Sequence, residues 1–115
     1  MSLDLTVLKR KSRKRKGSTE EVWSGNITHN LGRMAKEIRT GNKTLYDLLW
    51  YAPEVVSHDY IGDLIEAFNR MIRDKERLEE YNSPNGWGTY YNLFQFLSDL
   101  ITCGIKPGML IRISK

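Results

Sequence analysis

The sequence contains little cysteine and no long apolar run. Its 115 residues include one cysteine, Cys103, which excludes a disulfide within the chain and a zinc site made of cysteines alone. No stretch approaches the roughly 18 apolar residues that a membrane-spanning helix needs, so no membrane association is expected. No apolar segment follows the first basic residues. We therefore expect no signal peptide and a cytoplasmic location, in a host cell if the gene is phage-encoded.

Common enzyme motifs are also missing. The chain has no glycine-rich dinucleotide motif, no phosphate-binding loop, no zinc-protease helix motif and no nucleophile elbow. The two histidines, His29 and His58, lie far apart in the sequence and are too few for a typical zinc site. We predict no metal and no cofactor. A general-base role for His29 is the one catalytic alternative, and the sequence favours a protein that is not an enzyme.

Positive charge is concentrated in one segment. The formal net charge is +4, but residues 9–16 (KRKSRKRK) hold seven of the 18 basic residues, so the rest of the chain is mildly acidic. This basic segment predicts either an arm that binds nucleic acid or a solvated hairpin loop whose charges discourage strand aggregation. No aromatic residue is interleaved to stack on bases, which favours the loop. The residues of the nucleic-acid alternative are Lys9, Arg10, Lys11, Arg13, Lys14, Arg15 and Lys16.

Apolar alternation predicts strands at both ends of the chain. It occurs in residues 3–8, in residues 20–28 with a bulge or a close backbone approach at Gly25, and in residues 109–115. Helical spacing predicts four helices between them: from Leu31 to Gly41, from a Thr44–Asp47 capping box to Pro53, over residues 59–81 with Ser57 or Asp59 as cap, and from Thr89 to Gly104. We therefore predict a single α+β domain over residues 1–115, in which an N-terminal hairpin and a C-terminal strand form a small antiparallel sheet against about four helices.

Two polar segments are candidates for a binding site. In the first, Asn26, Thr28, His29 and Asn30 lie where a strand meets a helix, and free N–H groups there favour anions. These side chains could equally form a turn and a helix cap. In the second, YNSPNGWGTYYN at residues 81–92, aromatic side chains around two glycines could stack on a ring or could plug the core. A third group, Trp50 and Tyr51 near His58, is more typical of core packing.

The two polar segments together resemble a known family. Four segments are similar to motifs of a family of small uncharacterised proteins from bacteriophages and prophages. They are SGNITHNLGRMAKE (residues 24–37), LYDLLW (residues 45–50), YNSPNGWGTYYNLFQFLSDLI (residues 81–101) and IRIS (residues 111–114). The resemblance covers about residues 22–114. The chain departs from it at Ser83, between Asn82 and Pro84, and in the basic segment. The resemblance implies no established activity, but it favours one composite site over two separate turns.

These observations predict a small phage-like accessory protein that binds a ligand and does not catalyse a reaction. The expected ligand is a phosphorylated or nucleotide-like small molecule, such as a host signal. Nucleic-acid binding through the basic segment and interaction with a host protein, or self-association through edge strands, remain as alternatives. The predicted ligand-binding residues are Asn26, Thr28, His29, Asn30, Asn85, Trp87 and Tyr90.

Overall fold

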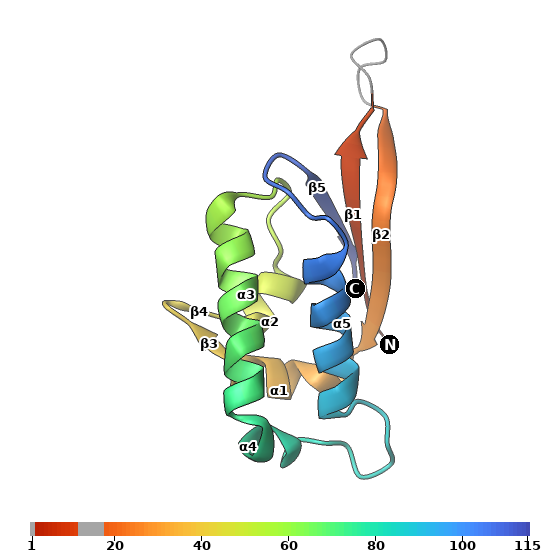
Figure 1. Ribbon diagram of the computed structural model, residues 1–115. Helices are drawn as coiled ribbons and strands as arrows, with labels where there is room; N and C mark the ends of the chain where they lie inside the picture. The colour runs from red at the N-terminus through yellow and green to blue at the C-terminus, as the bar shows by residue number, and fades with distance from the viewer. Residues whose placement is uncertain (1, 12–17) are drawn as a thin grey trace.

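The protein has an antiparallel sheet with helices packed against one face, which is the predicted α+β architecture (Figure 1). The computed structural model describes residues 2–11 and 18–115. Its elements are β1 (Ser2–Arg10), β2 (Thr19–Thr28), the 3-10 turn η1 (His29–Leu31), α1 (Gly32–Lys36), β3 (Arg39–Thr40), β4 (Lys43–Thr44), α2 (Leu45–Trp50), α3 (His58–Arg73), α4 (Lys75–Glu79), α5 (Tyr90–Thr102) and β5 (Leu110–Ser114).

The described strands form a main sheet in the order β2-β1-β5, with both pairings antiparallel. On β1, Leu3, Leu5 and Val7 are fully buried, whereas Asp4 is exposed. This alternation is typical of a strand with one face on the core and the other in solvent. The predicted pairing of an N-terminal hairpin with a C-terminal strand is confirmed.

A β-bulge and a close approach occur at different places on β2. The register shifts where Val7 pairs with Trp23 and Leu8 pairs with Glu21, so the extra residue is Val22 and not Gly25. Aromatic side chains, and not another backbone as the alternative prediction stated, lie close to Gly25. A Cβ atom there would lie 2.6 Å from the Trp23 ring and 3.2 Å from the ring of Phe96 on α5.

The first predicted helix is shorter than expected. α1 ends at Lys36, and Arg39–Thr40 pairs with Lys43–Thr44 in a small hairpin, β3–β4. Gly41 has a φ of 58° and lies between these strands, so it makes a hairpin turn and does not end a helix. A glycine serves both purposes because it adopts positive φ without a steric penalty. The predicted capping box of α2 is confirmed: Asp47 N–H donates to Thr44 Oγ1 at 3.3 Å, and Thr44 N–H donates to the Asp47 carboxylate at 3.0 Å.

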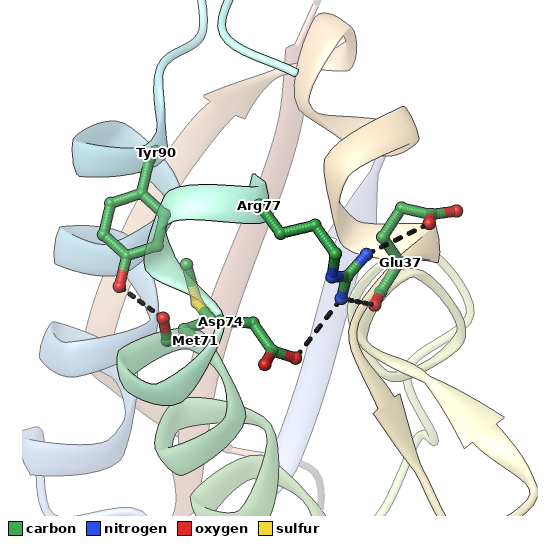
Figure 2. A network of polar contacts seen from close by, with 5 residues as sticks. All are labelled: Glu37, Met71, Asp74, Arg77 and Tyr90. Carbon is green, nitrogen blue, oxygen red and sulfur yellow. Dashed lines mark hydrogen bonds and ion pairs between the residues drawn. The ribbon is translucent and has the colours of Figure 1, made fainter. Parts of the chain in front are cut away.

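The long helix predicted over residues 59–81 is two helices. Ser57 caps α3 as predicted, by accepting the N–H of Tyr60 at 3.1 Å. The helix breaks at Asp74, and α4 turns so that Arg77 reaches the end of α1. Figure 2 shows Arg77 donating to the Glu37 carboxylate at 3.3 Å, to the Glu37 carbonyl at 3.1 Å and to the Asp74 carboxylate at 3.3 Å.

Helices α3 and α5 run side by side, and α5 lies against β2 of the main sheet (Figure 1). The rings of Phe68 and Phe94 join them, with centroids 4.8 Å apart. Asn92 Oδ1 accepts the N–H of Thr89 at 2.9 Å at the start of α5, which matches the predicted start. Gly104, with a φ of 95°, follows its end, as predicted. Among the residues that the structure describes, no helix is long and apolar enough to cross a membrane.

Candidate functional site

The first polar segment joins β2 to η1 through a capped turn. Thr28 Oγ1 accepts the N–H of Asn30 at 3.4 Å and so caps η1. Before this turn the strand alternates as predicted: Ile27 is buried, and Asn26 is exposed on the opposite face. Thr28 thus contributes to local structure, while Asn26 is available to a ligand.

His29 is bonded to the core. The indole N–H of the buried Trp50 donates to His29 Nδ1 at 3.0 Å. Since Nδ1 accepts, the neutral ring carries its proton on Nε2, which is buried and has no hydrogen-bond partner within the described residues. Neither nitrogen is free to take a proton from a substrate, so the geometry does not favour the general-base alternative.

The second polar segment contacts the first directly. Asn30 Nδ2 donates to the Trp87 carbonyl at 3.3 Å. Gly88 has a φ of 94°, and a Cβ atom there would lie 2.9 Å from Thr28 Cγ2 and 3.3 Å from Asn30 Cβ. The loop before α5 therefore packs on the turn after β2, at the lower end of the molecule in Figure 1.

Two asparagines, Asn82 and Asn85, also form hydrogen bonds that stabilise the conformation of this loop. Asn85 Oδ1 accepts the N–H of Trp87 at 3.0 Å and the hydroxyl of Ser83 at 2.5 Å. Asn82 Oδ1 accepts the N–H of Tyr90 at 2.7 Å, at the first turn of α5. These bonds leave the Trp87 side chain 69% exposed at the tip of the loop.

An open cavity of about 1190 Å³ lies between β2, the loop of residues 85–88 and α5. We call this cavity the β2 hollow. Parts of both motifs predicted as one composite site line this same cavity. The predicted residues that line it are Asn26, Thr28, His29, Asn30, Asn85 and Trp87.

Tyr90 is the exception among the predicted ligand contacts. It is 3% exposed, does not line the β2 hollow, and donates its hydroxyl proton to the Met71 carbonyl at 2.7 Å (Figure 2). Burial raises the pKa of the Tyr90 hydroxyl, and the charge of Glu79 and of Tyr91 raises it further. Its helical spacing with the other core residues of α5 is the physical reason: Tyr90 packs between α5 and α3 as a core side chain.

The α5 wall of the hollow is not predictable from the sequence. Asn92, Gln95 and Asp99 recur at helical spacing and look like an ordinary solvated face, so no local pattern distinguishes them. Phe96 is buried beneath them and lines the base of the hollow with Trp23, their rings 5.3 Å apart. Only the packing of α5 against β2 brings these side chains to the site.

The lining is mainly polar and contains no lysine or arginine among the described residues. Asp99 is the carboxylate that lines the hollow, and Gln95 donates to it at 2.9 Å. Most of the other polar lining groups are amides and hydroxyls. This chemistry suits neutral hydrogen-bonding groups or a cation better than a phosphate.

The wall along β2 is made by its edge. β1 is the strand paired with β2 in the described residues, so alternate N–H and C=O groups of β2 point away from the sheet. Every residue from Trp23 to Thr28 lines the hollow, although their side chains alternate between the two faces. A continuous run of this kind lines one cavity only where the backbone edge itself borders it.

The first three residues of the basic segment, Lys9, Arg10 and Lys11, lie at the far end of the same hairpin. Lys9 pairs with Glu20 at 3.6 Å, Arg10 ends β1, and the N–H of Lys11 donates to the Ser18 carbonyl at 3.0 Å. These bonds make residues 9–11 part of the hairpin end. Arg13, Lys14, Arg15 and Lys16 lie outside the described residues.

The remaining candidates divide between core and surface. Trp50 is buried as predicted, whereas Tyr51 is 63% exposed, with Lys115 Nζ 4.0 Å from its ring centroid.

Burial raises the pKa of the Cys103 thiol. In the part of the chain that the structure describes, no three His, Cys, Asp or Glu side chains are grouped to hold a metal ion.

No family model matches the chain, and neither a curated protein nor a solved structure matches it. The resemblance to small phage and prophage proteins therefore stays a prediction from the motifs.

Proposed function

We propose that the protein is a non-enzymatic binding module whose β2 hollow holds an extended peptide segment of a partner protein. The observation that carries this proposal is the run from Trp23 to Thr28, which lines the hollow with the open edge of β2. A peptide added to this edge pairs its main chain with the outward N–H and C=O groups of β2. Such pairing supplies affinity without a deep pocket.

The rest of the hollow supplies specificity. Side chains of an added strand alternate, so every second one enters the hollow towards α5 and Phe96. The exposed indole of Trp87 provides an apolar contact at one end, and exposed tryptophans are enriched at the energetic centres of protein interfaces. Asp99 favours a lysine or arginine at one inward position of the peptide.

A phosphorylated small molecule is a weaker fit to this site. Phosphate sites use cationic side chains or the N-termini of helices, and no lysine or arginine of the described residues lines the hollow. The cavity is also open and larger than the roughly 300–1,000 Å³ of typical small-molecule sites. An extended peptide occupies such a groove with its own backbone hydrogen-bonded to one wall.

The phage-like resemblance adds a context to this proposal. A small accessory protein of a phage that captures an exposed segment of a host protein would act by occupying that segment. This corresponds to the host-factor alternative from the sequence, and the site chemistry favours it over sequestration of a nucleotide.

Selection from a library of random linear peptides displayed on particles tests the proposal. We expect selected peptides of extended character that carry a basic residue. Replacing Trp87 with alanine should weaken their binding roughly tenfold or more, since exposed aromatic anchors contribute about 1–2 kcal/mol or more to interfaces. The matched control is Tyr51→Ala, which removes an aromatic side chain that is 63% exposed away from the hollow, and it should leave binding unchanged.

Chemical-shift mapping of the bound peptide locates the contact. Perturbations centred on residues 23–28 and 85–99 support the proposal. Failure to select any peptide, or selected peptides that bind Trp87→Ala as tightly as the original protein, would contradict it. Stoichiometric release of a nucleotide from the freshly purified protein would favour the small-ligand prediction instead.

A further inference from the structure

The β2 hollow has two chemically different ends. At one end, Trp23 on β2 meets Phe96 on α5, with ring centroids 5.3 Å apart. At the other end, the loop before α5 packs on the turn after β2, and the side chain of Trp87 in this loop is 69% exposed. β2 and α5 therefore run antiparallel along two walls of the hollow (Figure 1). An elongated molecule that fills the hollow meets both ends at once.

The Trp23 ring is held in place at its end. A Cβ atom on Gly25 would lie 2.6 Å from two carbons of this ring and 3.2 Å from the Phe96 ring, so the indole lies along the strand, over the backbone of Gly25. Trp23 is half-buried and lines the hollow, so part of the indole is accessible to a bound molecule. An aromatic ring attracts a cation placed over its face.

Asp99 adds a negative charge at the same end. It lies one helical turn beyond Phe96 on α5, is exposed, and lines the hollow. Gln95 donates to one of its carboxylate oxygens at 2.9 Å, and no cation of the described residues forms an ion pair with it. Since no described lysine or arginine lines the hollow, a cationic group of the bound molecule would be the partner of this carboxylate.

An indole beside a carboxylate suits a guanidinium group better than an ammonium group. The guanidinium is planar and weakly hydrated, so it stacks on an aromatic face while its in-plane N–H groups donate to a carboxylate. The ammonium group of lysine is a compact and strongly hydrated charge without this planar geometry. The Trp23 end therefore favours arginine over lysine.

The register of β2 sets the spacing between the two ends in a bound peptide. Trp23, Gly25 and Ile27 pair with fully buried residues of β1, so these three positions of β2 face the helices. Side chains directly opposite one another on paired strands lie on the same face of a sheet. A peptide added to β2 therefore sends three alternate side chains into the hollow. The first is opposite Trp23, and the third is opposite Ile27, beside the turn on which the Trp87 loop packs.

We propose that the β2 hollow recognises a peptide with an arginine four residues away from a large apolar residue. The arginine lies opposite Trp23, stacks on its indole and donates to Asp99. The apolar residue lies opposite Ile27 and contacts Trp87. Either direction of the peptide chain satisfies this spacing, so the arginine precedes or follows the apolar residue. This inference rests on the proposed function and specifies its ligand.

Parallel selections from one library of random linear peptides test this pattern. The original protein should enrich arginine four residues from a large apolar residue. Asp99→Asn should still select extended peptides with the apolar residue but without enriched arginine, because the variant keeps an acceptor for Gln95 and loses the charge. Asp59→Asn is the matched control and should select the original pattern, since Asp59 is exposed, has no ion pair with another described residue and does not line the hollow.

Affinities of one selected peptide separate the two contacts of the arginine. Replacing this arginine with glutamine should weaken binding to the original protein roughly three- to tenfold, the range expected of a cation–π contact together with an exposed ion pair. Asp99→Asn should reduce this difference. Trp23→Leu should remove the preference for arginine over lysine, and because both peptides are measured on the same variant, a lower stability of that variant does not produce this result.

The outcomes distinguish this inference from the proposed function. Selected peptides that lack arginine at this spacing, or an arginine preference that persists in Asp99→Asn, would overturn the inference and leave strand addition to β2 in place. Failure to select any peptide would overturn both.

Discussion

At the scale of single residues, Gly88 connects the two polar motifs. Its positive φ brings the loop against the turn after β2, where a side chain would meet Thr28 and Asn30. Asn30 then bonds to the loop through the Trp87 carbonyl. The conformation of one glycine thus allows two distant segments to share a cavity.

Replacing Gly88 with alanine should therefore lower the free energy of unfolding by more than the backbone strain of a positive φ would. Gly86 provides the matched control, because it also has a positive φ, of 79°, but an added Cβ there meets nothing within 4 Å. We expect Gly86→Ala to lower the free energy of unfolding by about 1–3 kcal/mol. Gly88→Ala should lower it by about a further 1 kcal/mol or more, from the clash with Thr28. Urea unfolding of both variants measures the difference, and equal values would show that the loop does not pack tightly on the turn.

Two buried tyrosines predict how stability changes at high pH. The hydroxyl of Tyr60 donates to the Leu48 carbonyl at 2.7 Å, and burial raises the pKa of Tyr60 well above its usual range; burial also raises the pKa of Tyr90. In the unfolded chain these groups lose their protons near pH 10. The contribution of the two buried hydroxyls to the free energy of unfolding is therefore fully present below about pH 10, and it is lost as the pH rises above that value.

Urea unfolding across the alkaline range, compared with Tyr60→Phe, measures this contribution. The variant should lose about 1–3 kcal/mol at neutral pH, because the buried Leu48 carbonyl loses its donor, and should show a shallower alkaline decline. Tyr51→Phe, at an exposed position, is the control and should match the original protein. The same alkaline decline in Tyr60→Phe and the original protein would show that Tyr60 does not contribute to it.

At the scale of elements, the hairpin β1–β2 has two chemically different ends. One end borders the β2 hollow, and the other carries Lys9, Arg10 and Lys11, where Lys9 pairs with Glu20. The hairpin therefore separates the proposed peptide site from these three cations.

The basic segment should bind nucleic acid weakly, without sequence preference and with a steep dependence on salt. Neutralising Lys9, Arg10 and Lys11 with glutamine should lower the slope of log affinity against log salt by up to roughly three units, since each phosphate contact adds about 0.9. Fluorescence anisotropy with a random DNA duplex measures this slope. The control neutralises three exposed cations on other elements, Lys36, Arg39 and Lys43.

Tight binding at physiological salt that this variant abolishes would instead make nucleic acid the main partner. An unchanged slope would assign the interaction to another surface.

The sequence predicted elements where local chemistry decides them. The Thr44–Asp47 box and the alternation of β1 both depend on near neighbours in the chain. The predictions from the sequence were wrong where contacts between distant segments determine the structure. Gly41 carries the same local signal for a hairpin turn as for a helix end, and the break at Asp74 accompanies a contact of Arg77 with Glu37, which is distant in the sequence.

Only the part of the candidate site that lies in unusual sequence motifs could be predicted, because the rest is assembled by packing. Asn26 and Trp87 belong to motifs with unusual composition, and both line the hollow. Gln95 and Asp99 look like an ordinary solvated helix face until α5 packs against β2. Tyr90 is the converse case, because its polar motif suggested a ligand contact while its helical spacing placed it in the core.

At the scale of the whole molecule, α5 is the shared wall between the β2 hollow and the core. Its Gln95 and Asp99 side lines the β2 hollow, whereas Phe94 and Ile101 pack against the core. The core therefore holds in place the helix that forms one wall of the proposed peptide site.

Backbone N-methylation of a selected peptide is the most direct test of strand addition to β2. Methyl groups placed on alternate residues remove every N–H on one edge of the peptide and leave the other edge intact. The account predicts that one of the two alternating patterns abolishes binding, because its N–H groups face β2, while the other pattern binds as well as the parent peptide. Equal binding of both patterns would show that the peptide is held by its side chains alone, and would contradict the claim that the open edge of β2 is the binding site.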